Sequence, residues 1–481
     1  MRNAIPFDPG LEHKSDDEEK IQDGLLSTIV KIEKLVFRKR ARAGRGVHVK
    51  SIGLLRGILT VHDDLPRELA QGLFTKPGSY EATIRLSTIP GDPLPDTVSV
   101  PRGFAVKIAG VKGKLLPEAK NHQVQDFLFA TGRAFSAPSP KKFLHSLRLL
   151  ALTTERMLWM KTTMSRVFRP IQKVATRFGH PVTPLDVLGG HVPTHPLGEC
   201  FFTQAPIRFG RYVAKLGIFP ESENFQALSK KMLNVDSDPD ALRNAVADVM
   251  RQEGGSWTLR AQLRRDEEMN PIEDASVVWP EENNPYLIVA TLTVPPQEGW
   301  SEELSRAIDD ALSFAPWHGL IEHQPLGAVM RARRRVYTRA AASRSAMNQR
   351  RVYIFPPWMT EPKKPRKAAA KPKKAPEATS KTAENPVKKE NPAVKVAAKK
   401  KAASATRSPV KAAPKKAVKA PAKTASAPKK STARPAAKTS VKATAKSSSK
   451  ATRKAPKPAP RPRSPAKAAP AKAAKARARH D

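Results

Sequence analysis

The sequence contains a single cysteine, Cys200, in 481 residues, so no intrachain disulfide can form. A reducing compartment is therefore the simplest expectation. No apolar run approaches the ~20 residues that span a bilayer. The first twenty residues turn acidic and lack the apolar segment of a secretory signal. Together these absences predict a soluble cytoplasmic protein with no membrane partner.

Aromatic residues are missing from the last part of the chain. Every Trp, Tyr and Phe lies at or before Trp358, whereas residues 361–481 consist mainly of Lys, Ala, Pro, Ser and Thr. These residues carry 37 Lys and Arg against 5 Asp and Glu, a net charge of +32, which leaves +10 of the chain's +42 for the first 360 residues. Such a segment cannot form a hydrophobic core, so we predict a disordered tail.

The charge of the tail predicts its partner. Closely spaced lysines neutralise phosphates and release counterions, which favours salt-sensitive, sequence-independent contact with DNA or RNA. The Lys/Ala/Pro composition resembles the C-terminal arms of linker histones. We therefore expect a cytoplasmic protein that associates with the nucleoid. The alternative is a tail that only increases solubility.

The rest of the chain alternates between strand and helix patterns. We interpret residues 1–22 as a polar N-terminal segment, 23–358 as the folded domain and 359–481 as the tail. Apolar positions at helical spacing follow Leu25. Short segments rich in β-branched residues, separated by Pro, Gly and Asp, predict an antiparallel or barrel-like sheet, with strands over 51–61, 79–89, 103–110, 123–130, 256–265 and 286–294. With helices over 138–177 and 325–347, the predicted fold class is α+β.

Three segments occur in an order that resembles the catalase superfamily. They are RGVHVKSIGLLRG (45–57), IRLSTIPGDPLPDTVSVPRGFAVKI (84–108) and RARRRVY (331–337). They resemble that family's Arg-x-x-His-Ala-Lys-Gly element, its Arg-Phe-Ser-Thr to Pro-Arg-Gly-Phe-Ala-Val-Lys-Phe element and the Arg-x-x-x-Tyr of its haem-binding helix. The second match is the most specific, because RLST, DT and PRGFAVK all stay in register. The resemblance, closest to a divergent catalase-like bacterial subgroup, implies an antiparallel β-barrel with surrounding helices and haem b as the cofactor.

The resemblance also implies which residues face one side of the haem. His48 is expected on the distal side, where a neutral imidazole can take a proton from one peroxide oxygen and return it to the other. Ser87 is expected to hydrogen-bond the Nδ1 atom of this imidazole and fix the ring. Arg45 and Arg85 are expected to pair with the haem propionates, since guanidinium groups bind carboxylates in a bidentate manner.

On the opposite side, Tyr337 resembles the proximal ligand of the haem iron. A phenol has a pKa of about 10, so a nearby cation is needed to stabilise the phenolate. Arg333 lies four residues earlier and therefore on the same face of the predicted helix. A tyrosine that packs a basic helix against the barrel is the alternative. Phe143 has the spacing from Phe135 of a phenylalanine that stacks near the haem, although a core position is equally consistent with it.

The sequence departs from the family in the distal region. Family members with full activity have an Asn in an Asn-Asn-Thr-Pro-x-Phe-Phe stretch, whereas the comparable QDFLFATGRAFSAP offers Ala130 or Thr131. Only Thr131 could supply a hydrogen bond. Val100 stands where the family usually has Asp. These departures favour a haem peroxidase acting on hydrogen peroxide or an organic hydroperoxide over a rapid catalase.

Two other functions remain consistent with the sequence. A non-catalytic haem-binding or haem-sensing protein, associated with nucleic acid through its tail, would tolerate the loss of the distal Asn. A nucleoid-associated protein with a vestigial folded domain would depend on the tail alone. The sequence also leaves a homo-oligomer open.

Overall fold

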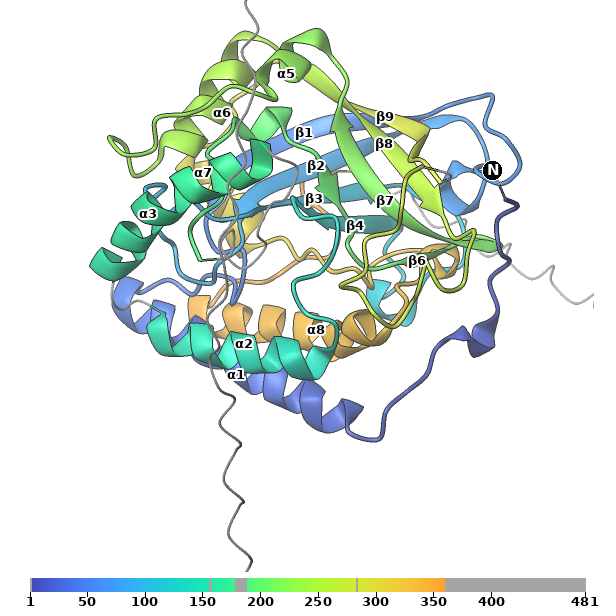
Figure 1. The fold of residues 1–481 in the computed structure, drawn as a ribbon, viewed down its shortest axis with the longest axis horizontal. Coiled ribbons are helices and arrows are strands. Elements are labelled where there is room, and N and C mark those ends of the chain that lie inside the picture. Colours follow the sequence, from blue (N-terminus) through green and yellow to red (C-terminus); the bar gives the residue numbers. More distant parts are fainter. Residues whose placement is uncertain (1, 155–157, 178–187, 283, 360–481) are drawn as a thin grey trace, which may run out of the picture. The chain divides into compact units, whose positions relative to one another are not determined.

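A computed structural model describes residues 2–154, 158–177, 188–282 and 284–359 (Figure 1). Of the predicted tail, residues 359–481, all but Met359 lies outside these ranges. Within them, no helix combines the length and the apolar character needed to cross a bilayer.

Antiparallel strands form the centre of the fold (Figure 1). In chain order they are β1 (Ser51–Val61), β2 (Gly78–Thr88), β3 (Arg102–Ala109), β4 (Val124–Ala130), β5 (Phe201–Phe202), β6 (Ile207–Phe209), β7 (Tyr212–Pro220), β8 (Gly255–Leu263) and β9 (Leu287–Val294). Their order across the sheet is β5-β4-β3-β2-β1-β9-β8-β7-β6. An additional pairing of β5 with β7 closes the sheet into a barrel. The predicted α+β fold with an antiparallel barrel surrounded by helices is confirmed.

The register of β2, β3 and β4 separates the barrel core from its outer face. Leu86 pairs with Phe104 and Phe104 with Phe129, and all three belong to the core cluster. Because side chains alternate along a strand, the neighbouring positions face outward. The next row across these strands therefore consists of outward-facing Ser87, Gly103 and Ala130.

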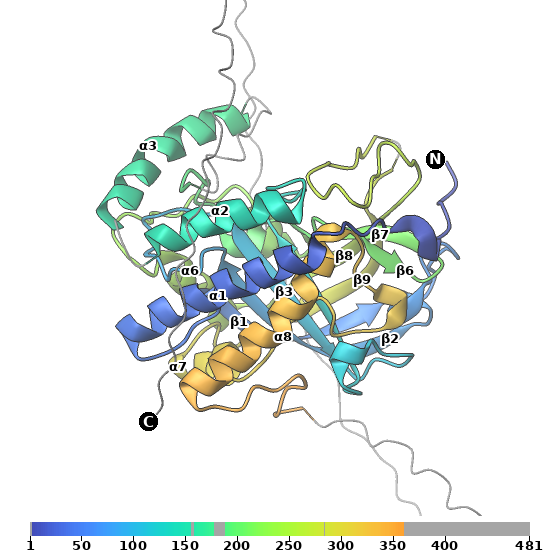
Figure 2. The same cartoon turned by 90° about the horizontal axis from the view of Figure 1, so that it is seen from below.

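Helices surround the barrel. They are α1 (Glu18–Arg40), α2 (Pro140–Thr153), α3 (Leu158–Arg177), α5 (Glu223–Leu228), α6 (Ala241–Gln252), α7 (Glu302–Ser305) and α8 (Ala328–Asn348). Figure 2 shows α1, α2 and α8 side by side on one side of the sheet. Apolar residues of all three helices form one buried cluster, with Ile29 and Ile32 from α1, Leu144 and Leu147 from α2, and Val336 from α8.

The first residues take a larger part in the fold than a polar lead-in would. Helix α1 begins at Glu18, within residues 1–22, for which only a polar N-terminal segment was predicted. Phe7 and Leu11 pack against a buried cluster that contains Trp279. Acidic side chains of this segment also bind Arg331 of α8. Residues 2–17 are thereby attached to both the barrel and the last helix.

Candidate functional site

His48 lies in the connection between α1 and β1, and both of its backbone groups are bonded. Its amide donates to the carbonyl of Ile89 at 2.7 Å, and its carbonyl accepts from Nη2 of Arg85 at 2.7 Å. Its φ of 56° lies in the left-handed region, which few residues other than glycine adopt. The two hydrogen bonds hold the backbone in this conformation and direct the imidazole over the outer row of the barrel.

The imidazole of His48 contacts that row directly. Its Nδ1 lies 3.1 Å from the Oγ of Ser87, so the contact expected from the sequence is present. A Cβ atom at position 103 would lie only 2.5 Å from the same Nδ1, so only glycine fits beside the ring. Among the described residues, Nε2 has no hydrogen-bond partner. The ring is thus held at one nitrogen and open at the other.

The surroundings of His48 keep its imidazole neutral. Burial is the main cause that lowers the pKa of His48 to about 3. The positive charges of Arg85, Arg333 and Arg45 act in the same direction. At pH 7 the side chain is therefore an uncharged imidazole, the form that can accept a proton.

Arg85 is engaged differently from the prediction. Its Nε donates to Oδ1 of Asp309 at 2.6 Å, in the π-helical turn Arg306–Asp310. The other carboxylate oxygen of Asp309 accepts from Ser51 and Ser305 at 2.6 and 2.8 Å. Burial would raise the pKa of Asp309, but the charges of Arg85 and Arg45 and the hydrogen bonds from Ser51 and Arg85 keep it below its usual value. The family resemblance implies a haem propionate as the partner of Arg85, whereas the structure pairs Arg85 with a carboxylate of the chain itself.

Two other arginines beside this pair have unused donors. Arg45 donates through Nη2 to the carbonyl of Leu312 at 2.8 Å, but its buried Nε has no partner in the described part of the chain. Arg344 of α8 is only 3% exposed, and its Nε and Nη2 likewise have none there. Burial and the charge of Arg85 lower the pKa of both guanidinium groups, and the charge of Arg344 lowers the pKa of Arg45 further. Arg344 is not among the residues predicted from the sequence, although its position seven residues after Tyr337 places both on the same face of α8.

Tyr337 and Arg333 are joined as their spacing predicts. Nη2 of Arg333 donates to Oη of Tyr337, and the guanidinium carbon lies 5.1 Å from the centre of the phenol ring. Both side chains are half-buried. The charge of Arg333 lowers the pKa of His48, and Tyr337 lies close enough to act on Arg45 when its phenol is ionised. The two pairs, from distant parts of the sequence, therefore lie within electrostatic range of each other.

The two remaining predicted residues have other partners. Phe143 of α2 is half-buried and packs edge-to-face on Phe135, with ring centres 4.9 Å apart, next to the α1–α2–α8 cluster. Thr131 accepts a hydrogen bond from the backbone amide of Arg102 at 3.3 Å, and no hydrogen bond joins it to His48 or Ser87. The alternative residue, Ala130, belongs to the row beside the imidazole. Of the two residues considered for the distal position, it is therefore Ala130, which has no polar side chain, that lies beside the imidazole.

Glu33 of α1 is buried close to the arginines. It is 1% exposed, and neither carboxylate oxygen makes a well-formed hydrogen bond among the described residues, although Ser343 and the backbone of Gly46 lie close enough to lower its pKa. Burial raises the pKa of Glu33 to about 7, against the lowering effect of the charge of Arg344. This carboxyl group therefore changes its charge near neutral pH, beside donors that are themselves unpaired.

We expect the charge of Glu33 to make the fold less stable as the pH rises. The folded state holds the Glu33 proton up to about pH 7, whereas the usual pKa is 4.5. The stabilisation present at low pH is thus lost as the pH rises between these values, by about 2 kcal/mol from pH 5 to pH 7. Glu33→Gln should remove this loss, as measured by urea unfolding of haem-free protein at both pH values. Glu19→Gln, at an exposed site on the same helix, is the control. An unchanged pH dependence in Glu33→Gln would contradict the assignment.

Comparisons with known proteins give structural similarities only. No protein-family model and no curated protein matches the chain. Similar solved structures include a fungal catalase (17% identity, TM-score 0.47), catalase A from Saccharomyces cerevisiae (18%, 0.46) and a bacterial catalase (13%, 0.44). The alignments cover 66%, 72% and 74% of this chain. They cover 65%, 69% and 66% of those proteins, respectively, so the chain spans less than two thirds of the first and the third. At these identities and TM-scores below 0.5, the similarities assign neither a cofactor nor an activity.

Proposed function

We propose that the chain binds haem b between His48 and Tyr337 and uses it to reduce hydrogen peroxide or an organic hydroperoxide. One observation carries the proposal. A neutral histidine hydrogen-bonded to Ser87 and a tyrosine hydrogen-bonded to Arg333 come from opposite ends of the folded sequence and lie within electrostatic range. These are the residue types that proton transfer to a peroxide and anionic ligation of a ferric haem require.

The unpaired arginine donors fit the haem propionates. A buried guanidinium without a partner is costly, and a carboxylate that accepts its hydrogen bonds removes that cost. Arg45 offers one unpaired donor nitrogen, Nε, and Arg344 offers two, Nε and Nη2. Arg85, already bound to Asp309, would instead hold the carbonyl of His48 in place. The proposal therefore assigns the propionates to Arg45 and Arg344.

His48 would act through Nε2. When bound, the haem iron supplies the redox chemistry that breaks the O–O bond. Nε2 can accept a proton only in the tautomer that carries its hydrogen on Nδ1, and Nδ1 then donates to Oγ of Ser87. The same Nε2 returns the proton to the departing oxygen. Ser87 thus selects the tautomer and fixes the ring, and His48 moves the proton.

Arg333 would prepare Tyr337 as an anionic ligand. Its Nη2 donates to the phenol oxygen, so the positive charge of Arg333 lies at the atom that would bind the iron and carry the negative charge of the ligand. A phenolate ligand in turn favours ferric iron.

The residues beside the imidazole favour a peroxidase over a rapid catalase. The outer row there consists of Ser87, Gly103 and Ala130, of which only Ser87 has a polar side chain. No amide side chain takes part in this row to orient a second peroxide. Haem-loaded full-length protein should consume hydrogen peroxide or an organic hydroperoxide, with more oxidation of an electron donor than oxygen release. Bound haem without peroxide consumption would favour the non-catalytic haem-binding alternative.

We also propose that residues 361–481 bind nucleic acid, with the protein located in the cytoplasm at the nucleoid. Their net charge of +32 supports this proposal. If the tail contacts as many as 6–10 phosphates, affinity for a DNA duplex of unrelated sequence should fall by about 10³- to 10⁵-fold between 50 and 200 mM salt. Fluorescence anisotropy at several salt concentrations measures this. A chain ending at residue 360 should bind at least ~10³-fold more weakly at 50 mM salt. Equal binding by the shortened chain would place the nucleic-acid site elsewhere.

A further inference from the structure

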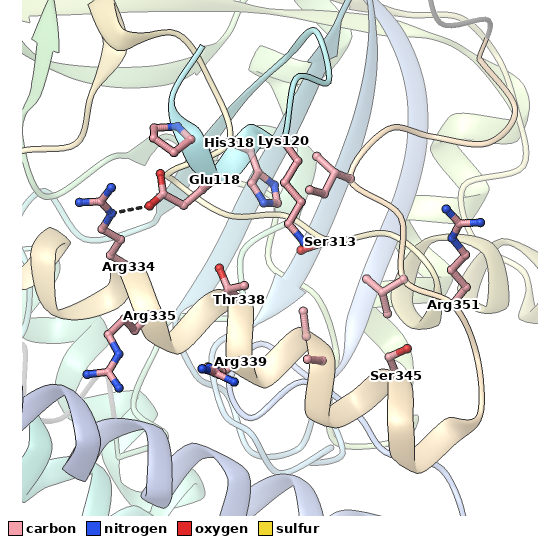
Figure 3. Close-up of a pocket in the computed structure, with 15 residues that line it drawn as sticks. Glu118, Lys120, Ser313, His318, Arg334, Arg335, Thr338, Arg339, Ser345 and Arg351 are labelled. Carbon is pink, nitrogen blue, oxygen red and sulfur yellow. Dashed lines mark hydrogen bonds and ion pairs between the residues drawn. The ribbon is translucent and has the colours of Figure 1, made fainter.

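A basic recess lies against α8, on a different face from Tyr337. It has a volume of about 550 Å³ and is bounded by α8, the Pro117–Ala119 turn with Lys120, and the residues after α8 (Figure 3). Arg334, Thr338 and Ser345 point into it from the helix. Arg333 comes one residue before Arg334, and Tyr337 one residue before Thr338. Because each residue turns the helix by about 100°, Arg333 and Tyr337 face a different direction from the recess. The recess is thus separate from the candidate haem site, although one helix lines both.

Positive charge in this recess exceeds negative charge. Arg334 pairs with Glu118, the acidic residue of the lining. Arg335 is compensated from α1, since Glu19 and Asp23 lie 3.5 and 3.2 Å from its guanidinium nitrogens.

Three further cations of the lining remain uncompensated. Lys120, Arg339 and Arg351 have no acidic partner within the described ranges. The guanidinium of Arg351 lies over the ring of Tyr353, 5.1 Å from its centre. His318 adds no charge near neutral pH, because burial lowers its pKa. These three positive charges line the recess, and no carboxylate of the described residues offsets them.

We propose that this recess binds a chain of two or three linked phosphates. A single carboxylate would leave most of the charge unmatched, whereas a di- or triphosphate carries about as many negative charges as there are free cations. Guanidinium groups bind phosphate oxygens in a bidentate manner. The hydroxyls of Ser313 and Thr338 lie in the same lining and can donate to further oxygens. The volume lies in the ~300–1,000 Å³ range of small-molecule sites.

Two sources could supply such a group. Inorganic polyphosphate needs only the cations. A nucleotide would also place its organic part against the apolar side chains of the lining, among them Val352 and Ile354. The shared chemistry is the phosphate chain, and the two sources differ in whether the organic part adds affinity.

The test measures thermal unfolding of full-length haem-free protein with inorganic triphosphate at constant ionic strength. A ligand that binds only the folded state raises Tm. Binding to the basic tail should not do so, because a segment without a core binds equally in both states. We expect a saturable rise in Tm in the wild type. The double variant Arg339→Gln, Arg351→Gln should need at least ~10-fold more triphosphate for the same rise.

Control variants distinguish a specific binding site from non-specific attraction of anions to positive charge. Arg211→Gln with Arg251→Gln removes two exposed arginines elsewhere and should leave the triphosphate response unchanged. Lys120→Gln tests the opposite wall and should also weaken it. A larger response to ATP than to triphosphate would identify a nucleotide, and equal responses would show that the phosphate chain suffices. The proposal is overturned if Tm does not rise, if sulfate produces the same rise, or if the double variant responds like the wild type. Because no haem is present, these outcomes are independent of the peroxidase proposal.

Discussion

His48→Ala is expected to lower peroxide turnover by about 10²- to 10⁴-fold, the contribution of a positioned general acid–base group. The imidazole is neutral, held by Ser87 at Nδ1 and unbonded at Nε2 among the described residues, so removing it removes the proton carrier and little else. Haem should still bind, because Tyr337, Arg45 and Arg344 are untouched. The measurement is the initial rate of peroxide consumption per bound haem.

The pH profile of the wild type provides a second readout for His48. Because its pKa is lowered to about 3, the imidazole stays neutral from pH 8 down to pH 5, and turnover should be nearly constant over this range. A histidine with an ordinary pKa of about 6.5 would lose roughly 30-fold of its neutral form at pH 5. Ser87→Ala, which frees the ring but keeps the base, should cost less than His48→Ala. Full activity in His48→Ala would show that this residue is not the proton carrier.

Tyr337→Phe is expected to weaken haem binding by more than the ~10–100-fold typical of residues that only support a metal ligand. The substitution removes one oxygen atom, the one that Arg333 hydrogen-bonds, and leaves the packing of α8 in place. Haem retained after gel filtration, relative to protein concentration, measures the effect. Arg333→Gln should give a smaller loss, because it removes the cation that favours the phenolate and keeps the ligand.

Tyr353→Phe is the matched control for Tyr337→Phe. Tyr353 lies beyond α8, where its ring faces Arg351, and it contributes no atom to the His48–Tyr337 site. This variant should retain haem as the wild type does. Wild-type haem retention in Tyr337→Phe would mean that another group binds the iron, or that the iron is not bound by a side chain of α8.

Local sequence patterns predicted six strands of the described barrel, β1 to β4, β8 and β9, but not β5, β6 and β7, which close it. The strand predicted over 51–61 is β1, Ser51–Val61, because its apolar run is long and bounded by turn residues. The closing strand β5 consists of only Phe201 and Phe202, too short for any period to be visible. Its position between β4 and β7 is set by tertiary pairing, which local patterns do not reveal.

The contacts of the candidate site also divide into those that local sequence patterns predict and those that they do not. Arg333 and Tyr337 are four residues apart on one helix, so their contact follows from helical geometry. The pairing of Arg85 with Asp309 joins residues 224 positions apart, and the burial of Glu33 depends on how α1 packs against α8. No local pattern predicts either contact. Arg344 could have been found, since it repeats the face of Tyr337 two turns later.

The absorption spectrum of full-length protein, incubated with haem b and then passed through a desalting column, tests the central claim most directly. We predict a ferric Soret band that co-elutes with the protein at one haem per chain and differs clearly in the Tyr337→Phe variant. A protein fraction without a Soret band, or one whose band is identical in that variant, would contradict haem ligation by Tyr337.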